Sequence, residues 1–326
     1  MWKIGNIEIN SCVVLAPMAG ITSFGYRHYM KRFGCEVAIT EMVSDMGLIY
    51  GNDETSRYID FPAEKYTGVQ LFGYDPNNIK KAALISLNKN PNIDFFDVNM
   101  GCPVPKVTKT GAGSFLMKKP QLCGKVIKEL KSATNLPVTA KIRLGINDSS
   151  INFLEVIDEL IKGGVDAIAI HARTAKQLYS GHANYELLRD LQNKISVPLI
   201  VSGDIMDLDS AIDAMKISKA TAVMVARGGV GNPFLIKQIN HYFETGEKLD
   251  NPTLLEQLDY CLELADELIK EKGENKAMLI YRSIAPKFLQ GYPNMKQFKN
   301  KMVTQLTTRE SLVNIIAEIK EFIKES

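Results

Sequence analysis

The sequence lacks the features that mark several classes of protein. Its five cysteines are scattered over 326 residues, and no two of them have the spacing of a zinc site or a redox motif. No apolar run approaches the roughly 20 residues that a membrane-spanning helix needs. The first residues contain no signal-peptide core. We therefore expect a cytoplasmic protein with reduced cysteines, without a metal ion and without a membrane partner.

Acidic side chains are absent from two stretches of an otherwise balanced chain. The net charge is +2, so the molecule as a whole has no field that would attract nucleic acid. Residues 98–128 contain six lysines, residues 276–309 contain seven basic side chains, and neither stretch contains Asp or Glu. Four aromatic residues are interleaved with the second stretch: Tyr281, Phe288, Tyr292 and Phe298. Such segregation suits a polyanion-binding face, and a solvated surface above core aromatics explains it equally well.

Eight short apolar runs, most of them separated by stretches with helical periodicity, indicate eight strands. The runs are Val13–Met18, Val37–Met42, Gly68–Phe72, Phe95–Asn99, Val138–Arg143, Ala167–His171, Leu199–Ser202 and Ala222–Ala226. Eight strands that alternate with helices over about 230 residues predict an α/β fold, a closed (β/α)8 TIM barrel. The main rival is an open doubly wound sheet. That fold usually has a glycine fingerprint after its first strand, and Pro17-Met18-Ala19-Gly20 is not that fingerprint.

Only helices are predicted after about residue 234. Thr253 stands where a helix N-cap is expected, and Glu256 stands at the matching capping-box position. No strand pattern follows, up to Ser326. We therefore predict two domains, a catalytic barrel over residues 1–238 and a small all-α helical bundle over residues 239–326.

The stretch Asp97-Val98-Asn99-Met100-Gly101-Cys102-Pro103 places one thiol just after a predicted strand. In a parallel α/β protein, the carboxyl end of a strand is where chemistry is assembled. A lone thiol beside a lysine-rich loop suggests an acid or a nucleophile that faces an anionic substrate. The alternative is a buried structural cysteine with solvated lysines, which composition alone favours.

Polar side chains stand at the carboxyl ends of most predicted strands, and a barrel would bring them to one mouth. They are Glu41, Gln70, Asn99, Cys102, Lys141, Arg143, His171, Arg173, Asp204 and Arg227. The loops after the last two strands contain Gly203, Gly228 and Gly229, which suits a phosphate cradle. A planar flavin fits the remainder, with Gln70 and Lys141 at the polar edge of its ring. A lone histidine or lysine would be weak support, whereas the coincidence of so many predicts a site.

Eight motifs in order resemble those of the tRNA-dihydrouridine synthases, and most closely the bacterial B-type. They are Leu15-Ala16-Pro17-Met18-Ala19-Gly20-Ile21-Thr22, Thr40-Glu41-Met42, Gln70-Leu71-Phe72-Gly73, the Cys102 stretch, Lys141-Ile142-Arg143, His171-Ala172-Arg173-Thr174, Gln177-Leu178-Tyr179-Ser180-Gly181 and Gly231-Asn232-Pro233. The resemblance implies an FMN-binding barrel followed by a helical tRNA-binding domain. It implies reduction of specific uridines in tRNA to 5,6-dihydrouridine, with NADPH or NADH as reductant, a hydride from FMN and a proton from Cys102.

The resemblance also implies roles for individual residues. Cys102 matches the catalytic proton donor. The matches to FMN contacts are Pro17, Met18, Ala19, Gln70, Lys141 and His171, and the matches to the phosphate-side loops are Ser202, Gly203, Asp204, Ala226 and Arg227. Asn99, Arg143 and Tyr179 fall where the family approaches the target uracil, and Arg282 fits a basic motif of the tRNA-binding domain. The departures are Ser23 for Asp, Ser202 for Asn, Ala226 for Gly, and Ser283-Ile284 for Lys-His.

Two other functions remain open from the residues alone. A flavin-dependent reductase or dehydrogenase of a free pyrimidine, similar to dihydroorotate dehydrogenase, would have a similar barrel and phosphate cradle. A small substrate would not need the basic stretch at residues 276–309, however. A non-catalytic RNA-binding protein on an inherited barrel would have no flavin. We expect a monomer with no obligate protein partner.

Overall fold

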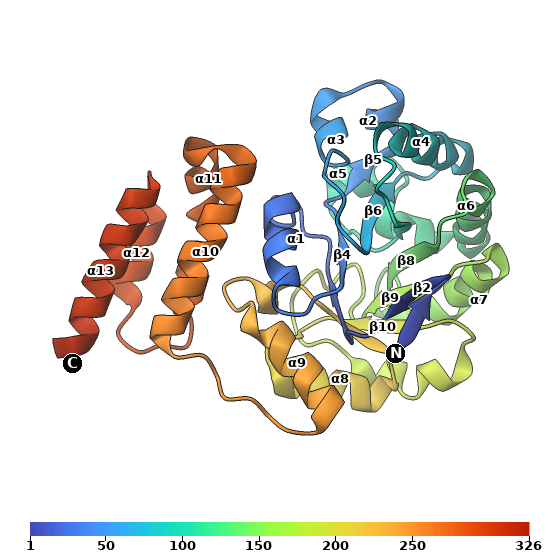
Figure 1. Ribbon diagram of the computed structural model, residues 1–326. Coiled ribbons are helices and arrows are strands. Elements are labelled where there is room, and N and C mark those ends of the chain that lie inside the picture. Colours follow the sequence, from blue (N-terminus) through green and yellow to red (C-terminus); the bar gives the residue numbers. More distant parts are fainter. Residues whose placement is uncertain (326) are drawn as a thin grey trace. The chain divides into compact units, whose positions relative to one another are not determined.

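The computed structural model describes residues 1–325, which fold into two compact units (Figure 1). The first unit comprises Met1–Thr22 and Cys35–Ala226. The second comprises Ser23–Gly34 and the chain from Arg227 onward. The predicted domain boundary between residues 238 and 239 stays a prediction, because compactness does not show which parts fold alone.

The first unit is a closed parallel barrel of eight strands (Figure 1). In chain order the strands are β3 (Val13–Leu15), β4 (Val37–Ile39), β6 (Thr67–Phe72), β7 (Phe95–Asn99), β8 (Val138–Arg143), β9 (Ala167–His171), β10 (Leu199–Ser202) and β11 (Ala222–Val225). Each strand pairs with the next in parallel, and β11 pairs with β3 to close the ring, with Val223 opposite Val13. The predicted TIM barrel is therefore confirmed.

Three short strands were not predicted. β1 (Trp2–Ile4) and β2 (Ile7–Ile9) form an antiparallel hairpin, and β5 (Val43–Ser44) pairs with β6. Runs of two or three residues contain too few alternations to give a period-2 pattern. The hairpin nevertheless matters for the barrel, because Ile4 and Ile9 are buried in its core together with Phe95.

Apolar side chains fill the barrel interior up to the level of Phe95. The core consists of Ile4, Ile9, Val14, Ala16, Val37, Ile39, Phe95, Ala167, Ala169, Ile200, Ala222 and Met224. Gly68 leaves room for the Phe95 ring, which a Cβ at that position would overlap. Each large apolar side chain buried in this way contributes about 1.5–3 kcal/mol. Because side chains alternate along a strand, Asp97 and Asn99 share the inward face of β7 with Phe95, and the interior turns polar above it.

Helices and short 3-10 turns connect the strands of the first unit. They are α2 (Asp45–Ile49), α3 (Asp53–Arg57), α4 (Pro76–Lys89), α5 (Pro105–Thr108), η1 (Gly113–Lys118), α6 (Pro120–Ala133), η2 (Asp148–Ser150), α7 (Phe153–Gly163), η3 (Tyr185–Leu188), η4 (Leu191–Lys194) and α8 (Leu208–Ser218). Helix α7 matches the helical periodicity of its sequence, and it buries Val156, Ile157 and Leu160. Gly164 ends the helix in the left-handed conformation at φ +90.

The second unit consists only of helices within the described residues. They are α1 (Phe24–Lys31), η5 (Arg227–Gly229), α9 (Phe234–Thr245), α10 (Leu254–Lys272), α11 (Glu274–Tyr281), η6 (Ala285–Leu289), α12 (Lys296–Thr304) and α13 (Arg309–Glu325). The predicted capping box is confirmed, because the Thr253 hydroxyl accepts from Glu256 N and Glu256 Oε2 accepts from Thr253 N. Across residues 1–325, none of the helices combines the length and the apolar content that crossing a lipid bilayer requires.

Helix α1 belongs to the second unit although its sequence lies between the first two barrel strands. Its first turn is held by Glu271 of α10, whose carboxylate accepts from Ser23 Oγ at 2.7 Å and from Gly25 N at 2.9 Å. Further along α1, the Tyr29 hydroxyl lies 3.0 Å from a carboxylate oxygen of Glu263. The chain therefore contributes to the second unit twice.

Candidate active site at the carboxyl ends of the barrel strands

The barrel register brings most of the predicted site residues to one end. Gln70 pairs with Asp97, Asn99 pairs with Lys141, and Arg143 pairs with His171 across neighbouring strands. Ser202 in turn pairs with His171. These residues lie at or near the carboxyl ends of five successive strands, which is where TIM-barrel enzymes place their chemistry.

Cys102 stands in a turn that several hydrogen bonds hold in place. Asn99 Oδ1 accepts from Gly101 N at 3.2 Å and from Cys102 N at 2.9 Å. Arg143 Nε donates to the Gly101 carbonyl at 3.0 Å, and Ser114 N donates to the Cys102 carbonyl at 2.9 Å. The backbone around the thiol is therefore fixed from three sides, by the strand end, by β8 and by the lysine-rich loop.

The thiol of Cys102 is half-buried, which distinguishes it from most other cysteines of the chain. Cys35, Cys123 and Cys261 are buried, and burial raises the pKa of the Cys123 and Cys261 thiols to about 12. Burial also raises the pKa of Cys12, on the N-terminal side of β3, to about 12. Those thiols are suited to packing, whereas Cys102 combines solvent access with a fixed backbone.

A buried polar chain leads from the Cys102 turn down into the barrel. Asn99 Nδ2 donates to Gln70 Oε1 at 2.9 Å, and Gln70 Nε2 donates to Asp97 Oδ2 at 2.6 Å. Thr139 Oγ1 donates to the other carboxylate oxygen, Asp97 Oδ1, at 2.6 Å. Gln70 has no exposed surface, so both ends of its amide are engaged inside the protein. We predicted Gln70 and Asn99 as site residues but missed Asp97 and Thr139, whose only signal is their place on inward-facing positions of β7 and β8.

Lys141 is a half-buried cation without a protein partner. Its ammonium makes no hydrogen bond or ion pair within residues 1–325. Burial and the neighbouring Arg143 lower the pKa of Lys141 to about 8, and Asp97 and Cys102 oppose part of that decrease. Holding an unpaired charge in such a place costs free energy unless a ligand supplies the partner. An anionic or hydrogen-bond-accepting edge of a planar cofactor such as a flavin fits this ammonium.

Arg143 ties together two loops at the barrel mouth. Besides Gly101, its guanidinium donates to the carbonyls of Thr174 and Leu178, each at 2.9 Å. Nη2 is the one nitrogen of this guanidinium without a hydrogen-bond partner in the described part of the chain. The guanidinium also lies 5.8 Å from the centre of the Tyr179 ring, whose residue is 59% exposed. One nitrogen of this guanidinium is therefore left to donate to a ligand.

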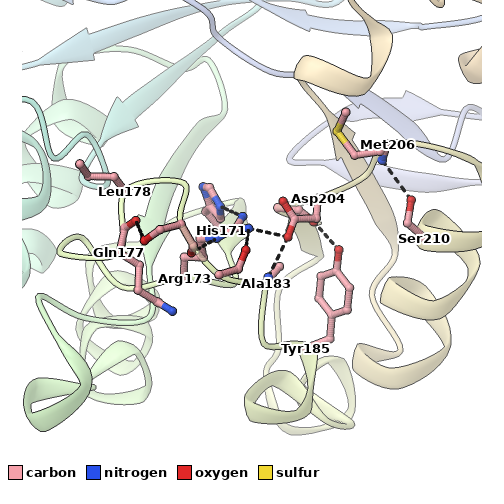
Figure 2. A network of polar contacts seen from close by, with 12 residues as sticks. His171, Arg173, Gln177, Leu178, Ala183, Tyr185, Asp204, Met206 and Ser210 are labelled. Atoms are coloured by element: carbon pink, nitrogen blue, oxygen red, sulfur yellow. Dashed lines mark hydrogen bonds and ion pairs between the residues drawn. The ribbon is translucent and has the colours of Figure 1, made fainter. Parts of the chain in front are cut away.

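Arg173 is the centre of a second network, between the ends of β9 and β10 (Figure 2). Its Nη2 donates to Asp204 Oδ2 at 2.5 Å and to the Gly181 carbonyl at 2.8 Å, and its Nε donates to the Ser180 carbonyl at 3.1 Å. Nη1 lies 3.3 Å from Nε2 of His171. A guanidinium can only donate, so Nε2 is the accepting atom of this contact.

The turn after β10 fits closely against His171. Gly203 has φ +108, and a Cβ there would lie 2.8 Å from Cδ2 of the His171 ring. The Tyr185 hydroxyl donates to the Gly203 carbonyl (Figure 2). Asp204 also has a positive φ of 49, and its carboxylate accepts from Ala183 N at 2.9 Å. The turn is thus rigid, and the phosphate role of Ser202, Gly203 and Asp204 stays a prediction.

The remaining predicted cofactor residues lie in two places. Pro17, Met18 and Ala19 follow β3 in a turn that is anchored at Gly20, whose N–H donates to Glu41 Oε2 at 2.7 Å. Ala226 ends the first unit, and Arg227 opens η5 in the second. In the part of the chain that the structure describes, no three His, Cys, Asp or Glu side chains gather to hold a metal ion.

The basic stretch of the second unit is built on a buried aromatic core. Tyr281, Phe288 and Phe298 are buried, and the half-buried Tyr292 donates to the Pro252 carbonyl. Arg282, the predicted tRNA contact, is half-buried and its Nε donates to the Leu306 carbonyl at 2.7 Å. The aromatics interleaved with this stretch are therefore packing residues, and its contribution to a polyanion site would come from its lysines.

The amino-acid sequence and the fold both match known proteins. A family model described as Dihydrouridine synthase (Dus) matches residues 14–324. A protein of Rickettsia conorii named "Probable tRNA-dihydrouridine synthase" is 35% identical over 326 residues, 98% of each chain. The tRNA-dihydrouridine synthase B of Shewanella oneidensis is 31% identical over 281 residues, 86% of this chain and 87% of its own.

Two solved structures share the fold at low sequence identity. The 6-hydroxypseudooxynicotine amine oxidase of Pseudomonas geniculata N1 has a TM-score of 0.55 and 14% identity, over 73% of this chain and 48% of that one. The histamine dehydrogenase of Rhizobium sp. 4-9 has a TM-score of 0.53 and 14% identity, over 73% and 47%. Our chain spans about half the length of these proteins, and the likeness concerns the fold alone.

Proposed function

Because the chain belongs to the dihydrouridine synthase family, we propose that it reduces uridine in tRNA to 5,6-dihydrouridine, with FMN as cofactor and NADPH as reductant. The family match extends from residue 14 to residue 324, so it includes both the barrel and the basic stretch. The observation that carries the proposal is the fixed, half-buried thiol of Cys102 beside the partnerless ammonium of Lys141. An acid and an interior cation at one barrel mouth suit a reduction that adds a hydride and a proton.

Different residues at the barrel mouth would bind different parts of the cofactor. When bound, the flavin supplies the hydride that carbon 6 of the uracil receives. In our proposal, Lys141 binds the polar edge of the flavin ring, and Pro17, Met18 and Ala19 lie along the ring. Gln70 is fully buried with its amide engaged, so it supports this edge from within. We propose that the phosphate side of the cofactor would be bound by His171, Ser202, Gly203, Asp204, Ala226 and Arg227.

Cys102 completes the reduction by giving its proton to carbon 5 of the uracil. The S–H bond breaks as the C–H bond forms, and water then reprotonates the thiolate. Arg143 Nη2 is the donor left for an oxygen of the base, and the exposed ring of Tyr179 offers it a stacking face. Asn99 holds the turn that presents the thiol.

Binding of tRNA must offset the cost of extruding the target base, which is a few kcal/mol. The loop after β7 carries four exposed lysines, Lys106, Lys109, Lys118 and Lys119, and none of them forms an ion pair within residues 1–325. In the second unit Lys276, Lys287 and Lys296 are exposed and equally unpaired within that range, whereas Lys301 pairs with Glu318. We propose that these lysines and Arg282 contact tRNA phosphates.

A reductase of a free pyrimidine is the alternative, and it is not favoured. The family match includes residues 276–309, which a small substrate would not require. The relatives that share most of this chain are named as tRNA-modifying enzymes. We further infer a monomer in the cytoplasm, which gel filtration and cell fractionation would test.

The decisive experiment combines the purified protein, FMN, NADPH and an unmodified tRNA transcript. Mass spectrometry of the digested tRNA should detect dihydrouridine, while free uridine and orotate should not be reduced. A parallel assay with NADH identifies the preferred reductant. Reduction of orotate but not of tRNA would overturn the proposal in favour of the alternative.

The matched variant is Cys102→Ala. It should bind FMN and oxidise NADPH as the parent protein does, yet form dihydrouridine at least about 100-fold more slowly, because general-acid catalysis contributes about 10²–10⁴-fold. Dihydrouridine formation at the parent rate by this variant would refute the proton-donor assignment.

A further inference from the structure

We propose that Asp97 is a positioning residue, whose carboxylate orients the amides of Gln70 and Asn99 and thereby sets the turn that presents Cys102. The proposal rests on the proposed function for the chemistry of the thiol. The hydrogen bonds that carry it are a property of the protein itself. Asp97 lies two residues before Asn99 on the inward face of β7 and is almost fully buried, at 1% exposure.

The direction of each hydrogen bond in the chain is fixed by the one before it. The carboxylate oxygen of Asp97 that faces Gln70 can only accept, so Gln70 must turn its NH2 group toward it. Gln70 then presents its carbonyl to Asn99, which must answer with its own NH2 group. The Asn99 carbonyl is left for the two backbone N–H groups of Gly101 and Cys102. A reversed Asn99 amide would place its NH2 against those donors.

This dependence on direction explains why a carboxylate lies in the barrel. An amide group has a donor end and an acceptor end of nearly equal size, so a row of amides alone has two arrangements. One acceptor-only group at the end of the row removes the second arrangement. Burial raises the pKa of Asp97, and the bonds from Gln70 and Thr139 and the nearby Lys141 oppose that increase. In the ionised form, which these bonds and Lys141 favour, both oxygens of Asp97 can only accept.

The first test compares Asp97→Asn with Thr139→Val. Asparagine has nearly the same shape as aspartate but can turn its NH2 group toward Gln70, which frees the row to reverse. Thr139→Val also removes a 2.6 Å hydrogen bond from Asp97, but from the side away from Gln70. Amide hydrogen exchange at Gly101 and Cys102 is the measurement. We expect it to become at least tenfold faster in Asp97→Asn and to change less than threefold in Thr139→Val.

Kinetics give the second measurement. In Asp97→Asn, reduction of tRNA by the pre-reduced enzyme should fall at least tenfold, while flavin content and NADPH oxidation without tRNA stay within threefold. Equal losses in Asp97→Asn and Thr139→Val would make Asp97 merely a buried group that needs partners, and would overturn the proposal. Unchanged exchange in Asp97→Asn would overturn it too. If the parent protein reduces no tRNA, the proposed function fails, but the exchange measurement still decides the role of Asp97.

A swapped pair provides the rescue. In the double variant Asp97→Asn with Gln70→Glu, the acceptor-only group sits at residue 70 and again accepts from Asn99 Nδ2. This variant should recover slow exchange at Cys102 and reduce tRNA at least threefold faster than Asp97→Asn, even where the single variant folds poorly. A swap that folds without such recovery overturns the proposal. So does failure of both variants to fold.

Discussion

Arg173 and Lys141 are both interior cations at the carboxyl end of the barrel, and the protein treats them in opposite ways. Arg173 has four partners: Asp204, Ser180, Gly181 and His171. Lys141 has none within residues 1–325, and burial with Arg143 lowers its pKa to about 8. A cation that four protein groups hold in place is part of the scaffold. A cation left without a partner in the same environment marks the place where a ligand must complete the structure.

Removal of Arg173 should have the largest effect on stability. Arg173→Met should lower the free energy of unfolding by about 3–5 kcal/mol, because it removes the guanidinium that pairs with Asp204 and donates to two loop carbonyls. Urea denaturation measures the change. Arg189→Met is the matched control, since its ion pair with Glu186 is exposed and should cost less than about 1 kcal/mol. Equal effects in the two variants would contradict the scaffold role.

Removal of the partnerless cation, Lys141, should have the opposite effect on the free energy of unfolding. Without flavin, Lys141→Met should unfold with a free energy equal to or above that of the parent, because a half-buried unpaired ammonium is replaced by an apolar chain. Its affinity for FMN, measured by fluorescence quenching, should fall at least tenfold, which corresponds to about 1.4 kcal/mol. A variant that binds FMN as tightly as the parent would remove Lys141 from the proposed cofactor site.

The pH dependence of stability should also differ between the parent protein and Lys141→Met. Folding lowers the pKa of Lys141 from 10.5 to about 8, so between these values the unfolded chain holds a proton that the folded protein has released. The cost of burying the ammonium is fully present below pH 8 and disappears as the pH rises toward 10.5. Relative to Lys141→Met, the flavin-free parent should therefore gain stability as the pH rises across this window. Thermal denaturation that follows the same pH course in both proteins would contradict the assignment.

The fold was largely predictable because buried parallel strands read as continuous apolar runs. The predicted bounds of β7, β8, β9 and β10 coincide with the observed ones. The first two predicted strands were too long, because after Leu15 and Ile39 the chain leaves the ladder for turns. One such turn forms where the Thr22 hydroxyl bonds to both backbone groups of Met18. Local apolar character does not report where the ladder ends.

The site was predictable only in part. The motif around Cys102 indicated the family, and the comparisons confirm that resemblance. The roles of the individual residues stay predictions. The sequence contains no sign that Arg173 would bind both the loop at residues 180–181 and Asp204, or that Asp97 would connect to Asn99 through Gln70. Such partners are set by the closure of the barrel. The alternation of residues along a strand predicts which face a side chain lies on, but it does not predict which side chains it contacts.

Helix α1 lies between the first two barrel strands in sequence, yet it packs with α10. The second unit is therefore not an appendage that a lineage could gain or lose at one junction. Any exchange of this unit between relatives has to transplant two separate segments, residues 23–34 and the chain from residue 227 onward.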